Sequence, residues 1–203
     1  MSQHPEFTGE VTDSVANRPA SWPVADTTVG FENAYLRVTV DTIEDGVGEQ
    51  HSRVVVRPRG AVAVAAVDDQ GRILLVQQFR HAVQKYTVEI PAGILDVAGE
   101  SKLDAAAREL AEEADVQAAS WSHLLNINTT PGFCSEEIDV FLAQDLNPVP
   151  IDARTEREAE EADMTHWWVS IDDAVKSVFA GDITDGKTIA AIFAVARLRS
   201  GAR

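Results

Sequence analysis

The chain has 203 residues, of which 45% are hydrophobic, and carries a formal net charge of −16. This length is enough to bury one substantial core and a small additional lobe. The few Lys and Arg residues argue against binding to a nucleic acid, because neutralising a phosphate backbone needs clustered cations. A small anionic substrate remains compatible with the charge if metal ions screen it.

Features that bear on location are sparse. Cys134 is the single cysteine, so no intramolecular disulfide can form, which is typical of a reducing compartment. The sequence has neither a signal pattern nor a long apolar run, and we expect a cytoplasmic protein without membrane contact. Residues 1–20 are polar and irregular, which predicts a flexible tail.

Residues 21–58 are expected to form a small N-terminal β lobe. Strands are predicted at 24–29, 36–42 and 52–57, and the second shows clean polar–apolar alternation in LRVTVDT. Three short strands make a poor independent core, so exchange of this lobe between two protomers would bury its edges.

Residues 59–203 are expected to form the main domain. Two apolar strands at 60–67 and 73–78 are joined by the turn DDQG. Further strands are predicted at 87–90, 122–127, 138–142 and 167–169, and helices at 102–114, 172–179 and 188–199. This order predicts an α+β fold, an α/β/α sandwich around a mixed sheet.

The helix predicted at 102–114 concentrates acidic residues. Its sequence, KLDAAARELAEEA, favours helix throughout, and Ser101 can cap it with Asp104 three residues on. Glu109 and Glu113 lie one turn apart on one face, with Glu112 beside them. Because like charges at this spacing repel, the cluster indicates a missing countercharge, and carboxylates alone favour Mg²⁺ or Mn²⁺. The alternative is a solvated acidic face.

A larger pattern surrounds this helix. Glu100 is followed after seven residues by Arg108-Glu109-Leu110-Ala111-Glu112-Glu113 and then by Val116. This pattern resembles the Nudix box, and thereby implies the Nudix fold and a metal-dependent hydrolase. Two positions depart from it: six residues rather than five separate Gly93 from Glu100, and Asp115 stands where the family has glycine. Asp115 at the helix end can adopt the left-handed conformation.

Other segments resemble the ADP-ribose pyrophosphatase branch of the family, of the actinobacterial type. They are Gln78-Phe79-Arg80-His81, Glu89-Ile90-Pro91-Ala92-Gly93, Pro131-Gly132-Phe133 and Glu160-Glu161-Ala162-Asp163-Met164. In that branch a proline about 15 residues beyond the box accompanies a preference for ADP-ribose, and Val116 to Pro131 is 15 here. The implied reaction is hydrolysis of ADP-ribose to AMP and ribose 5-phosphate.

The resemblance also implies roles for individual residues around the metal. Glu109, Glu113 and the backbone oxygen of Ala92 would bind two or more Mg²⁺ ions, with Mn²⁺ as the alternative. Glu112 and Arg108 would support catalysis, and Arg108 and Glu100 would orient the helix carboxylates. The general base would be Glu161, with Glu160 as the alternative. A solvated loop is the competing interpretation, because TEREAEEAD holds five acids in nine residues.

Substrate contacts follow from the same resemblance. Arg80 would meet the diphosphate or the terminal ribose, and Pro131 and Gly132 would line the substrate site. Tyr35 and Arg53 would stack on adenine from the N-terminal lobe, across a homodimer. Two alternatives stay open: a Nudix hydrolase of another nucleoside diphosphate sugar or dinucleotide, and a non-catalytic sensor that binds ADP-ribose.

Overall fold

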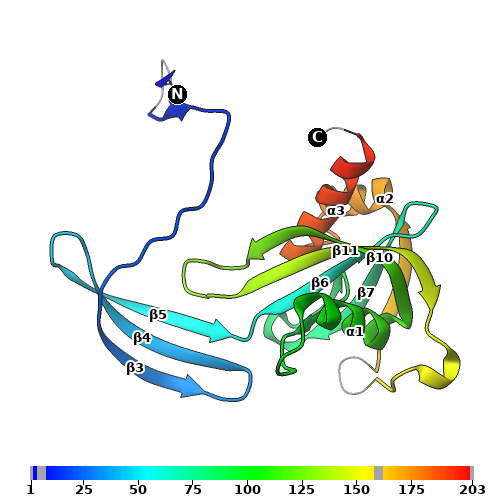
Figure 1. The fold of residues 1–203 in the computed structure, drawn as a ribbon, viewed down its shortest axis with the longest axis horizontal. Helices are drawn as coiled ribbons and strands as arrows, with labels where there is room; N and C mark the ends of the chain where they lie inside the picture. The colour runs from blue at the N-terminus through cyan, green and yellow to red at the C-terminus, as the bar shows by residue number, and fades with distance from the viewer. Residues whose placement is uncertain (1, 4–7, 158–161, 202–203) are drawn as a thin grey trace.

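The structure is a computed structural model that describes residues 2–3, 8–157 and 162–201 (Figure 1). A β layer built from two sheets forms the centre of the main domain. One sheet has the order β10–β11–β6–β9 and the other β12–β7–β8. In the first sheet β11 and β6 run parallel and the other neighbouring strands antiparallel, so this sheet is mixed as predicted. The strands are β6 (Ala61–Ala66), β7 (Arg72–Arg80), β8 (Lys85–Glu89), β9 (Ala92–Ile94), β10 (Val116–Asn128), β11 (Glu137–Pro148) and β12 (Thr165–Ser170).

Helices cover both faces of this layer. On one face α1 (Lys102–Ala114) packs Leu110 against Val62 and Val64, and on the other α2 (Ile171–Ala180) and α3 (Gly186–Arg199) pack against Ala63 and Ile73. Successive residues of β6 therefore enter opposite cores, as the period of a strand requires. The predicted α/β/α sandwich is confirmed (Figure 1). No helix in the described ranges is long and apolar enough to cross a membrane.

A separate antiparallel sheet, β3–β4–β5, projects from this domain (Figure 1). It contains β3 (Val24–Glu32), β4 (Leu36–Glu44) and β5 (Gln50–Pro58), and every residue of β3 is exposed. The loop between β10 and β11 reaches it, because Val56 N donates to Phe133 O at 2.8 Å and Ser135 N to Val56 O at 2.9 Å. Ahead of the sheet, β1 (Ser2–Gln3) pairs with β2 (Glu10–Val11), and residues 12–23 form neither helix nor strand.

The predicted elements are present, but several extend further than the sequence indicated. β10 and β11 have 13 and 12 residues, about twice the predicted lengths. Their outer halves are rich in Ala, Ser, Asp and Asn, which are weak signals for a strand, and hydrogen bonding to the neighbouring strand extends them. Two short 3₁₀ turns, η1 (His81–Val83) and η2 (Ile151–Ala153), complete the structure.

Candidate active site

The acidic helix α1 forms where the sequence predicts it and is capped at both ends. At its start, Ser101 Oγ accepts a hydrogen bond from Asp104 N at 3.1 Å. At its end, Asp115 adopts the left-handed conformation with φ 55°, and its N–H donates to Ala111 O at 3.1 Å. Asp115 thus takes the backbone conformation for which glycine is usually selected, at a cost of about 1 kcal/mol.

Arg108 is the centre of the carboxylate cluster on this helix. Its guanidinium donates to both oxygens of Glu100 at 3.0 Å, to Glu109 Oε1 at 2.8 Å and to Glu112 Oε2 at 3.0 Å. Donation to Glu100, with the nearby charge of Glu109, raises the pKa of Arg108 above its usual range. Arg108 thus pairs with Glu112 one turn away, and the same guanidinium also holds Glu100 and Glu109.

Two of the box carboxylates, those of Glu109 and Glu113, lie against strand β9. Glu113 is 3% exposed and accepts a hydrogen bond from Ala92 N at 2.9 Å. Glu109 is 9% exposed, and its carboxylate sits so close to the backbone of Gly93 that a Cβ added there would overlap it. Glycine at position 93 is therefore required by close approach and not by a turn. Buried carboxylate oxygens beside a peptide backbone form a donor set that suits a hard divalent cation such as Mg²⁺ or Mn²⁺.

A cavity of about 730 Å³ lies next to this cluster. Ala92 and Gly93, which contact the carboxylates of Glu113 and Glu109, also line the cavity. Its walls come from β7, β8, β9, the ends of β10 and β11, and the start of α3. The volume is within the range of pockets for small organic ligands. Strand β9 is thus shared by the acidic cluster and the cavity.

The cavity wall holds two cations around one buried acid. Arg80 Nε and Nη2 each donate to Glu89 at 2.8 Å, and Lys187 Nζ donates to Glu89 and, at 3.1 Å, to Asp185. Glu89 is 2% exposed. Burial alone would raise the pKa of Glu89, but the hydrogen bonds from Arg80 and the charge of Lys187 outweigh it and hold the pKa at about 2. Glu89 is therefore ionised at neutral pH.

The structure brings together only some of the residues predicted for the site. Arg80 and Ala92 line the cavity, and the helix carboxylates adjoin it. Pro131 and Gly132 lie in the loop between β10 and β11, which contributes Thr129 and Glu136 to the cavity wall instead. Glu160 and Glu161 lie outside the described residues.

Tyr35 lies in the turn between β3 and β4, Arg53 lies in β5, and neither residue lines the cavity. Leu36 pairs with Pro58, whereas Asp41 pairs with Arg53. Tyr35 is six residues from Asp41, so Tyr35 and Arg53 are separated within one chain by roughly 20 Å, at about 3.4 Å per residue. One chain alone does not stack both side chains on the same adenine.

Sequence reasoning gave no role to Glu89 or Lys187. Glu89 was recognised only as part of the segment Glu89-Ile90-Pro91-Ala92-Gly93, and its burial depends on the packing of β8. Lys187 is the second residue of α3, two residues after the capping residue Asp185, and this is an ordinary position for a solvated lysine. The 98 residues that separate it from Glu89 conceal the contact.

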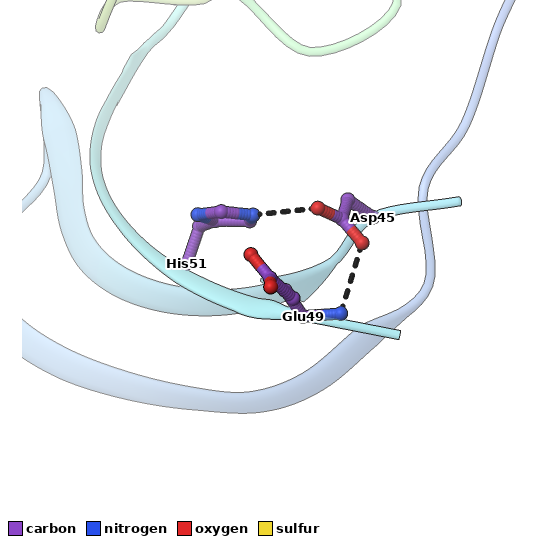
Figure 2. Close-up of side chains that lie close together, drawn as sticks. All are labelled: Asp45, Glu49 and His51. Atoms are coloured by element: carbon purple, nitrogen blue, oxygen red, sulfur yellow. Dashed lines mark hydrogen bonds and ion pairs between the residues drawn. The ribbon is translucent and has the colours of Figure 1, made fainter. Parts of the chain in front are cut away.

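A second group of ligand-type side chains lies at the tip of the β4–β5 hairpin (Figure 2). The ligand atoms of Asp45, Glu49 and His51 lie within 4.8 Å of one another. Asp45 accepts hydrogen bonds from Val47 N at 3.0 Å, from Glu49 N at 2.9 Å and from His51 Nε2 at 2.9 Å. The hydrogen bond from His51 and those from the backbone lower the pKa of Asp45 to about 2. These hydrogen bonds close the hairpin turn, which explains why the three side chains lie together.

Comparison with known proteins places the chain in a family. A family model described as NUDIX domain matches residues 57–192, and the chain belongs to the Nudix family. It is 44% identical over 150 residues to the ADP-ribose pyrophosphatase of Mycobacterium tuberculosis (strain ATCC 25618 / H37Rv), covering 74% of this chain and 71% of the relative. It is 36% identical over 163 residues to the ADP-ribose pyrophosphatase of Bacillus subtilis (strain 168), covering 80% and 85%.

A solved structure confirms the fold. The crystal structure of an ADP compounds hydrolase superposes with a TM-score of 0.77 and covers 92% of this chain and 98% of its own. The two sequences are 20% identical, so this similarity is one of architecture. The predicted Nudix fold and the predicted Nudix family are both confirmed.

Proposed function

We propose that the protein hydrolyses the diphosphate bond of ADP-ribose, in a metal-dependent reaction, to AMP and ribose 5-phosphate. The main observation behind this proposal is that the carboxylate cluster adjoins the cavity, since Ala92 and Gly93 contact both. The two relatives named as ADP-ribose pyrophosphatases, each matched over most of its length, support the choice of substrate.

Glu109, Glu113 and the backbone oxygen of Ala92 would hold two or more Mg²⁺ ions, with Mn²⁺ as the alternative. A metal held there would neutralise the diphosphate and would favour attack by water. Arg108 has a different task, because its bonds to Glu100, Glu109 and Glu112 fix three carboxylates in one orientation. Fixed carboxylates need less reorganisation when the transition state forms.

The cavity would receive the phosphoribosyl half of the substrate. Arg80 and Lys187 present two cations to an anionic ligand, and Glu89 holds both of them in place. We assign the general base to Glu161, with Glu160 as the alternative. Pro131 and Gly132 would act through the loop that lines the cavity at Thr129 and Glu136.

We further propose that residues 21–58 form the dimerisation lobe of a homodimer, with residues 59–203 as the catalytic domain. Phe31, Val40 and Val54 are exposed, and the register places all three on the same face of the sheet. An exposed apolar face on a small sheet is typical of a protein interface. Tyr35 and Arg53 from this lobe would stack on adenine, and a second copy would bring the two together.

Turnover of a substrate panel tests the proposal. ADP-ribose, ADP-glucose, NADH, a diadenosine polyphosphate and 8-oxo-dGTP would each be incubated with Mg²⁺ and with EDTA. We expect ADP-ribose to give the highest kcat/KM and EDTA to abolish turnover. A preference for another member would favour the alternative of a different nucleoside diphosphate substrate. Tight ADP-ribose binding without any turnover would favour the sensor.

A further inference from the structure

The last turn of α1 poses an electrostatic problem that the helix does not solve by itself. Glu109, Glu112 and Glu113 lie near its C-terminal end, and no basic residue of α1 lies in its last turn. The C-terminus of a helix carries a partial negative charge and carbonyls without partners in the helix, so carboxylates there are disfavoured. Arg108, one turn earlier in α1, pairs with Glu109 and Glu112, but the carbonyls at the end of the helix need donors from another part of the chain.

Two side chains from beyond β11 supply these donors. Arg157 Nε donates to the backbone oxygen of Glu112 at 2.9 Å, and His166 Nε2 donates to the backbone oxygen of Glu113 at 2.6 Å. Asp115 holds Arg157 in place, because Arg157 Nη2 donates to Asp115 Oδ2 at 2.7 Å. The side chains of Asp115 and Arg157 are 20% and 21% exposed, so solvent only partly screens the pair.

We propose that Asp115, Arg157 and His166, here called the C-terminal brace, are positioning residues for two carboxylates: that of Glu113, which would bind the metal, and that of Glu112 beside it. The brace fixes the backbone from which these two side chains project, and it gives a function to the aspartate that replaces the glycine of the Nudix box. This inference rests on the proposed function for its catalytic consequence.

Two substitutions of opposite charge test the brace. Asp115→Gly removes a negative charge and restores the residue that best adopts the left-handed conformation, whereas Arg157→Gln removes a positive charge. If the residues acted only through their charge, the affinity for Mn²⁺ would fall in the first variant and rise in the second. Loss of positioning predicts that both bind Mn²⁺ about tenfold more weakly, the effect typical of groups that orient metal ligands.

The readouts are Mn²⁺ binding by paramagnetic resonance, kcat with ADP-ribose and thermal unfolding without metal. We expect kcat to fall about tenfold in each variant, with little further loss in the double variant because the two residues act as one unit. The unfolding temperature of Asp115→Gly should stay within about 4 °C of wild type, since glycine relieves backbone strain. Arg154→Gln is the matched control, because it also removes a positive charge near Asp115, at 3.7 Å. Unlike Arg157, Arg154 donates to Val149 O and not to a carbonyl of α1.

Opposite shifts in Mn²⁺ affinity, or unchanged affinity and kcat in both variants, would show that Asp115 and Arg157 are not positioning residues. If the wild type binds Mn²⁺ but does not hydrolyse ADP-ribose, the proposed substrate fails, while the Mn²⁺ comparison still decides the role of Asp115 and Arg157.

Discussion

Gly93 and Glu109 lie in direct contact, with no room for a side chain between the strand β9 and the carboxylate. We predict that Gly93→Ala displaces the Glu109 carboxylate and lowers kcat/KM by at least about tenfold, or 1.4 kcal/mol in the barrier. Gly46→Ala is the control, because a Cβ at Gly46 meets nothing within 4 Å. Equal activity of the two variants would show that the position of Glu109 does not matter.

Arg108 binds its carboxylates through geometry as well as charge. Arg108→Lys keeps the positive charge but cannot donate to Glu100 with two nitrogens while holding Glu109 and Glu112. We expect the Mg²⁺ concentration for half-maximal activity to rise several-fold. Arg37→Lys is the control, because Arg37 makes one exposed ion pair of 3.9 Å with Glu32. A wild-type Mg²⁺ requirement in Arg108→Lys would mean that charge alone is sufficient.

Glu89 should make stability depend on pH. The pKa of Glu89 in the folded protein is about 2, below the ordinary value of 4.5. Its contribution to the free energy of unfolding is therefore complete above about pH 4.5 and is lost as the pH falls towards 2. We predict that Glu89→Gln lowers the free energy of unfolding by roughly 2–3 kcal/mol at pH 7, less than for a fully buried pair because Arg80 is partly exposed. Denaturant titrations of both proteins at pH 7, 5 and 3 measure the difference, which should shrink at pH 3. A difference that is constant with pH would contradict the assignment of charge to Glu89.

The β3–β4–β5 sheet should carry the dimer contact. Val54→Asp places a charge on the face that also exposes Phe31 and Val40, and we expect the variant to be monomeric in light scattering where the wild type is dimeric. Val47→Asp is the control, since Val47 is 84% exposed at the hairpin turn. A monomeric wild type at micromolar concentration would refute the dimer, and with it the stacking of Tyr35 and Arg53 on one adenine.

Local patterns predicted the parts of this molecule that local forces determine. The helix at 102–114, its cap at Ser101 and the left-handed Asp115 follow from spacing and propensity. The α/β/α layers follow from the order of apolar segments.

Contacts between distant segments were beyond the reach of these patterns. Lys187 meets Glu89 across 98 residues and Arg157 meets Glu112 across 45, and in each case the sequence shows only an isolated charge. Such contacts depend on how the sheet and the helices pack, and packing is not encoded in a short window. The full length of β10 and β11 was missed for the same reason, because their outer halves are extended by pairing with each other.

The most direct measurement is the product analysis of wild type and Glu113→Gln incubated with ADP-ribose and Mg²⁺. The proposed function predicts equal amounts of AMP and ribose 5-phosphate from the wild type, none in EDTA, and a loss of at least about 100-fold, or 2.7 kcal/mol, in the variant. Glu32→Gln, at an exposed position of β3, should keep wild-type turnover. Undiminished turnover in Glu113→Gln, or turnover that persists in EDTA, would contradict a metal-dependent site on α1.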